Sequence, residues 1–201
     1  MISNVCKIEK GTNDLAEILS ESEKVAVYNG LDKKQSLQLR LICEEMDGML
    51  PKIIDDFNGD LWIEFNKGVC KVNVCIDIPE LNSEKKDELI KVSKSKKNAL
   101  AVGIVGKIRS VIEDFFLKEK AGVSFNTNSG EFYSSTGLSF SYLWTLNGYK
   151  ENATDKETEK WDELEKSIIA NLADDVIVGV KGKKATIVAI KNFKWGSKKW
   201  T

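Results

Sequence analysis

The sequence of 201 residues contains no histidine. Histidine is the side chain that ordinarily titrates near neutral pH, and its absence excludes Ser-His-Asp catalysis, Cys-His catalysis and histidine-ligated metal sites. It also excludes a protein that phosphorylates its own histidine. Any chemistry must therefore use carboxylates, lysines, hydroxyls or a bound cofactor.

The sequence also lacks a cysteine motif for metal binding. It has four cysteines, and none of them form a C-x-x-C pair. Cys70 and Cys75 lie on one predicted strand at an odd spacing, so their side chains point to opposite faces and cannot readily share a metal ion. We therefore expect free thiols in a reducing compartment, with no structural zinc site.

Neither sign of charge dominates, and long apolar runs are absent. Thirty basic residues against 31 acidic residues give a net charge of −1, so no overall field attracts nucleic acid or an anionic membrane. No segment approaches the ~20 apolar residues of a membrane span, and the N-terminus lacks the apolar core of a signal peptide. These absences predict a cytoplasmic protein with neither nucleic acid nor membrane as a partner.

A helical pattern dominates the segment from Lys33 to Phe57. Apolar residues recur there at the helical period and form one broad face: Leu39, Ile42, Cys43, Met46, Met49, Leu50 and Ile53. Glu45 projects beside this face, where a carboxylate costs free energy unless it is paired, protonated or used in chemistry. Glu45 is therefore a candidate functional acid, and the alternative is a structural acid paired with a lysine. Pro51 predicts a kink or a restart of the helix between Gly48 and Pro51.

The other elements follow from periodicity and turn residues. Helices are expected at 13–29, after the glycines at 103 and 106, and at 158–173; strands are expected at 5–9, 61–65, 69–78, 139–146, 176–180 and 185–191. Alternation along 69–78 puts Ile76 and Ile78 on the apolar face and Asp77 on the other face, which is typical of an antiparallel pair packed on helices. The charged segment 80–98 is either a solvated helix or a cover over a site.

Gly103 and Gly106 open the helix that follows the charged segment. Backbone amides at a glycine-containing helix start can approach an anion, which the helix dipole helps to hold. The same spacing of small residues also serves close packing between helices. The two glycines alone do not separate these alternatives.

The order of elements resembles the Bergerat-fold (GHKL) ATPase domain that histidine kinases and gyrase share, and it is most similar to the anti-sigma-factor serine kinase branch. The resemblance covers roughly residues 5–118 and 174–193 and leaves 119–173 as an apparent insertion. It implies one α+β domain over residues 1–201. The implied architecture is a two-layer sandwich, in which a mixed, largely antiparallel sheet packs on helices as in the histidine-kinase ATPase domains.

Three segments look like the motifs of that family. LQLRLICEEMDGML looks like the helix that supplies a general base and a magnesium ligand, with Glu45 as the base and Met49 in place of the asparagine ligand. VCIDIPEL looks like the adenine-reading motif, with Asp77 as its carboxylate and a proline where the family has glycine. AVGIVGKIRSV looks like the phosphate-binding segment, with Gly103, Gly106 and Lys107. The resemblance thus implies ATP or ADP as a ligand, and magnesium without its usual asparagine, because a thioether does not replace an amide oxygen on a hard cation.

The function that the resemblance implies is regulation by protein contact, with an eroded ATP site. The partner would be a sigma factor or an antagonist protein, and a homodimer is allowed. An alternative is an active ATP-dependent serine kinase or ATPase, in which Glu45 activates a serine hydroxyl. A third reading, independent of the family, is an unrelated α+β domain that binds a small ligand or a peptide.

Overall fold

The computed structural model describes residues 1–12, 15–54, 56–78, 103–120, 132–133, 139–140, 142–152 and 167–193. Six strands form one sheet in the order β1-β2-β3-β8-β7-β6, and each neighbouring pair for which a register is given is antiparallel. In sequence order these strands are β1 (Cys6–Glu9), β2 (Asn58–Asn66), β3 (Val69–Asp77), β6 (Tyr142–Thr145), β7 (Asp175–Lys181) and β8 (Lys184–Asn192). A separate two-stranded sheet pairs β4 (Phe132–Tyr133) with β5 (Ser139–Phe140).

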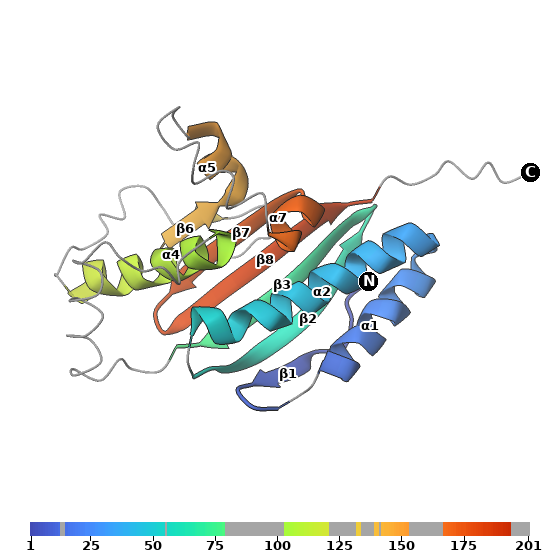
Figure 1. The fold of residues 1–201 in the computed structure, drawn as a ribbon, viewed down its shortest axis with the longest axis horizontal. Coiled ribbons are helices and arrows are strands. Elements are labelled where there is room, and N and C mark those ends of the chain that lie inside the picture. The colour runs from blue at the N-terminus through green and yellow to red at the C-terminus, as the bar shows by residue number, and fades with distance from the viewer. Residues whose placement is uncertain are drawn as a thin grey trace, which may run out of the picture.

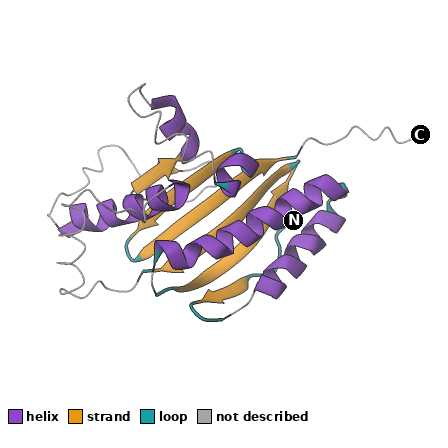
Figure 2. Cartoon of the chain, viewed as in Figure 1, coloured by secondary structure: helices purple, strands orange, loops and turns teal. Residues whose placement is uncertain are grey.

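Helices cover one face of the six-stranded sheet (Figure 1, Figure 2). The helices are α1 (Leu15–Tyr28), α2 (Lys33–Ile53), α4 (Gly103–Lys120), α5 (Leu146–Asn152) and α7 (Ile168–Leu172). Helix α2 lies along the middle of the sheet, with α1 on one side and α4 and α7 on the other (Figure 1). The α+β architecture of helices packed on a largely antiparallel sheet is therefore confirmed, although the expected mixed sheet is antiparallel at each of these described pairings.

The strands expected at 61–65 and 69–78, and those expected at 176–180 and 185–191, pair as two hairpins. Buried Leu61, Ile63 and Phe65 alternate with less buried residues along β2, which pairs with β3 through the turn at 67–68. Strands β7 and β8 are joined through Gly182, whose φ of +57° is a left-handed conformation that glycine adopts without strain. Gly59 is also required, because a Cβ at this position would collide with the backbone carbonyl oxygen of Cys75 on β3.

Helix α2 begins with a complete capping box. The Asp32 carboxylate accepts a hydrogen bond from the backbone N–H of Gln35 at 2.8 Å, and the Gln35 side chain accepts one from the Asp32 N–H at 3.0 Å. The helix then continues through Pro51 to Ile53, so of the expected kink or restart between Gly48 and Pro51 the restart is wrong. Pro51 lies in the last turn and removes the one hydrogen bond that its N–H would donate to the carbonyl four residues before it. The buried Leu50 and Ile53 nevertheless hold that turn on the sheet, and the N–H of Ile54 still donates to the carbonyl of Leu50 at 3.0 Å.

The strand expected at 139–146 is also wrong in its extent. It is divided into β5 and β6, and Leu146 is instead the first residue of α5. The hydroxyl of Thr145 accepts a hydrogen bond from the N–H of Gly148 at 3.0 Å, and the Asp175 carboxylate accepts one from the N–H of Asn147 at 3.0 Å. These two acceptors satisfy amides of the first helical turn, so Thr145 acts as a helix cap as well as a strand residue.

Part of the apparent insertion at 119–173 belongs to the main sheet, because β6 pairs with β7. Of the helix expected at 158–173, the described part is α7. The charged segment 80–98 and the C-terminal residues 194–201 lie outside the described residues.

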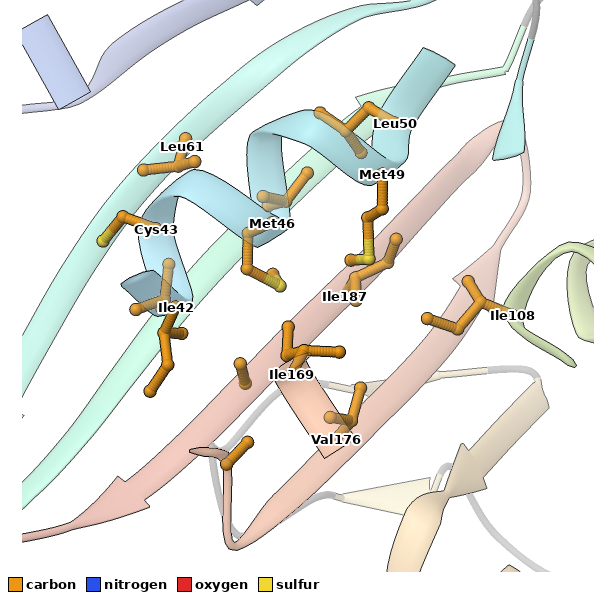
Figure 3. Close-up of a cluster of buried hydrophobic side chains, with 14 of the residues drawn as sticks. Ile42, Cys43, Met46, Met49, Leu50, Leu61, Ile108, Ile169, Val176 and Ile187 are labelled. Carbon is orange, nitrogen blue, oxygen red and sulfur yellow. The ribbon is translucent and has the colours of Figure 1, made fainter. Parts of the chain in front are cut away.

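The core lies between α2 and the sheet. Figure 3 shows buried side chains of α2 gathered in one cluster with those of β2, β7, β8, α4 and α7. The labelled members of this cluster are Ile42, Cys43, Met46, Met49, Leu50, Leu61, Ile108, Ile169, Val176 and Ile187. This packing sets which flank of α2 faces α4 and α7, and it therefore sets the surroundings of Glu45.

Candidate functional site

Glu45 lies on the flank of α2, one turn before Met49. It is half-buried, as the helical pattern predicted, and in the described part of the chain it makes no ion pair or hydrogen bond. Its neighbour Glu44 differs, because the Glu44 carboxylate pairs with Arg40 at 3.0 Å. The described contacts therefore supply no lysine for the structural alternative, and Glu45 keeps the character of a candidate functional acid.

Met49 is part of the core. Its side chain is 3% exposed and points from α2 toward Ile187 on β8 (Figure 3). A thioether is a poor ligand for magnesium in any orientation. Because the side chain at position 49 packs against the sheet, it also cannot reach a cation bound on the solvent side of α2.

Asp77 lies at the end of β3, on the sheet face opposite the helices. The preceding Ile76 is fully buried beneath the helices, and the following Ile78 is buried as well. The Asp77 carboxylate forms an ion pair with the Lys184 ammonium at 2.8 Å, and the hydrogen bond to Asp77 raises the pKa of Lys184. Strand parity had predicted this placement, and its consequence is that Asp77 and Glu45 lie on opposite sides of the sheet.

Gly103 and Gly106 lie in the first turn of α4, as expected. Gly103 is its first residue and has a φ of +77°, and Gly106 is buried. The buried Ile104 and Ile108 pack the same helix on the core. Because α4 contacts α2, the two glycines and Glu45 come from neighbouring helices on the same face of the sheet.

Lys107 is held by an aromatic ring that the sequence did not single out. Its ammonium lies 4.9 Å from the ring centroid of Tyr149 on α5, a cation–π contact. The ring of Trp144 on β6 lies 6.1 Å from that of Tyr149, and among the described residues the buried Trp144 Nε1 finds no hydrogen-bond acceptor. The contact fixes the Lys107 ammonium beside α5 and leaves N–H donors that point away from the ring.

All four cysteines are free, and three of them are buried: Cys6, Cys43 and Cys70. Burial raises the pKa of Cys70 to about 12. Burial, together with the nearby thiols of Cys70 and Cys6, raises the pKa of Cys43 well above its usual range. These thiols are therefore core residues rather than nucleophiles, because the thiolate is the reactive form.

Within the described ranges, no group of three or more acidic or cysteine side chains is arranged to hold a metal ion. None of the described helices has the length and apolar character that crossing a membrane requires. Comparison of the chain with protein-family models, with curated proteins and with solved structures found no match.

Proposed function

We propose that this chain is a cytoplasmic regulatory domain of the anti-sigma-factor kinase type, with a Bergerat-like fold, that acts mainly by protein–protein contact. Its ATP site is eroded. The partner is a regulatory protein, such as a sigma factor or an antagonist of one. Nucleotide hydrolysis is not its main activity.

The order of elements supports the scaffold part of the proposal. A short strand, a helix, the long α2, an antiparallel hairpin that ends at Asp77, a helix that opens at Gly103 and a terminal hairpin follow one another in the order of the resemblance. The two long helices that carry Glu45 and the glycines are neighbours on one face of the sheet. These relations concern the backbone and do not require an active site.

The separation of Asp77 from Glu45 is the observation that carries the proposal of an eroded site. A nucleotide site needs a group that reads the base and groups that act on the phosphates within one pocket. The Asp77 carboxylate instead lies on the far side of the sheet, paired with Lys184 at 2.8 Å. Met49, in the position of the magnesium ligand, is buried in the core. Two of the three motifs thus lack the side-chain placement that their chemistry needs.

One observation favours the alternative, an active ATP-dependent serine kinase or ATPase. Glu45 is a half-buried carboxylate for which the described residues provide no ionic partner. Such a group is suited to accept a proton from a hydroxyl. In that case Glu45→Gln abolishes turnover and leaves nucleotide affinity nearly unchanged, and turnover that is the same in this variant excludes Glu45 from the mechanism.

Calorimetric titration of the purified chain with ATP and with ADP, each with and without magnesium, tests the proposal. We expect no binding heat below millimolar nucleotide. Magnesium-dependent binding at micromolar nucleotide would contradict the eroded site and support the kinase alternative. Micromolar binding without magnesium would indicate a nucleotide-sensing switch that lacks catalysis.

A further inference from the structure

Large apolar side chains are exposed where α1 passes into α2. Val27 and Tyr28, the last residues of α1, are 75% and 76% exposed, and Leu37 in the second turn of α2 is 54% exposed. Both helices lie on the same face of the sheet (Figure 1), so their exposed residues point away from it. Backbone hydrogen bonds from Gly30 to Val27 and from Leu31 to Ala26 hold the connection compact, at 3.1 Å and 3.0 Å.

Two lysines lie between these apolar residues in sequence. Lys33 and Lys34 are the first residues of α2, both are exposed, and neither forms an ion pair within the described part of the chain. The nearby Asp32 carboxylate is used in the capping box, and the first turn of α2 contains no acid. Ammonium groups at this position interact unfavourably with the helix dipole, so the stability of α2 does not account for them.

We infer that this α1–α2 corner, formed by Val27, Tyr28, Lys33, Lys34 and Leu37, binds an acidic amphipathic peptide segment of the partner protein. The inference rests on the proposed function and names the chemistry of the partner. Apolar side chains of the segment cover the three exposed apolar residues, and its carboxylates pair with the two lysines.

A second copy of the chain fits the corner less well than a different protein does. In a two-fold contact the same surface of both copies is used, so Lys33 and Lys34 of each copy enter an interface to which the five residues of the corner contribute no acid. Like charges that face each other in an interface oppose association. The charge of the corner therefore favours a partner with the opposite sign.

A phage-displayed library of random peptides, selected on the full chain, provides the probe. We expect the enriched peptides to combine apolar residues with Asp or Glu. Binding of a labelled selected peptide, measured by fluorescence polarisation, should weaken about tenfold or more in Val27→Asp and in the double variant Lys33→Glu/Lys34→Glu. Two matched controls, Ile168→Asp and Lys10→Glu, change an exposed apolar residue and an exposed lysine elsewhere, and they should bind as the parent does.

Three results would overturn the inference: no enriched peptide, enriched peptides without acidic residues, or binding that Val27→Asp leaves unchanged. A fourth is a dimer in size-exclusion chromatography with light scattering that Val27→Asp dissociates, because the occupant would then be a second copy. The milder Leu37→Ser guards against a variant that does not fold, and thermal melting monitors each variant. Magnesium-dependent ATP turnover would contradict the proposed function but would not bear on peptide binding at the α1–α2 corner. Failure of the proposed function is therefore distinguishable from failure of the inference about the corner.

Discussion

Replacement of Met49 by asparagine tests whether position 49 belongs to the core or lines a nucleotide pocket. The proposed Bergerat-like family has a magnesium-binding asparagine at this position, whereas the Met49 side chain here is 3% exposed and packs toward Ile187 (Figure 3). The substitution removes a buried apolar side chain, which costs about 1.5–3 kcal/mol, and leaves an amide without partners, which costs about 1–3 kcal/mol. The expected loss of unfolding free energy is the sum, about 2.5–6 kcal/mol.

Urea denaturation followed by circular dichroism measures this loss. Met49→Leu is the matched control, because a swap that nearly conserves volume costs less than about 1.5 kcal/mol. If Met49→Asn unfolds the domain outright, Met49→Ala gives a measurable intermediate, with an expected loss of about 2–5 kcal/mol. Equal stability of Met49→Asn and Met49→Leu would contradict the burial of this side chain, since position 49 would then face solvent or a polar pocket. Stabilisation of Met49→Asn by magnesium and ATP would indicate that the site still takes a nucleotide.

Three further predictions test other parts of the structure. In the folded protein a thiol reagent should label Cys75, the one cysteine that is partly exposed, and it should label the other three thiols only after unfolding; rapid labelling of all four would contradict the core. Gly59→Ala should lower the unfolding free energy by about 1–3 kcal/mol or more, measured in urea, because its Cβ meets the Cys75 backbone, and an unchanged midpoint would disprove that contact. The hydrogen bond from Lys24 lowers the pKa of Glu21, helped by two hydrogen bonds from Asn4 and opposed by burial. The ionised Glu21 therefore stabilises the fold fully above its ordinary pKa of 4.5, and this contribution is lost as pH falls through the lowered pKa. The difference in unfolding free energy between the parent and Glu21→Gln should therefore close in acid. A difference independent of pH would argue against an ionised Glu21.

Residues close in sequence were sufficient to predict features that depend on a single element. Asp32 stands just before the periodic residues of α2, where a side-chain oxygen satisfies a free amide at a helix start, and the structure adds Gln35 as its partner in the capping box. The parity of β3 likewise placed Asp77 on the face opposite Ile76 without knowledge of any other strand. The half-burial of Glu45 followed from its position beside the apolar face of α2.

Signals that depend on distant residues could not be read in the same way. Thr145 continues a strand pattern, yet its hydroxyl caps α5. Asp175 supplies a second acceptor, and it lies 28 residues along the chain from the Asn147 amide that it binds. Pro51 predicts a break when it is considered alone, and packing of Leu50 and Ile53 on the sheet maintains the helix. The contact of Lys107 with Tyr149 joins two helices whose approach no spacing indicates.

The sequence by itself therefore determined α1, α2, the start of α4 and the two hairpins, with the buried face of each, because periodicity and capping act within a few residues. It also determined what chemistry is excluded, since a chain without histidine has none to use. Only the tertiary structure decided the strand order and which side chains share a site. Packing of α2 on the sheet sets Glu45 and Asp77 on opposite sides of the sheet and leaves the α1–α2 corner exposed. Burial depends on all the elements that meet at a point rather than on any one of them.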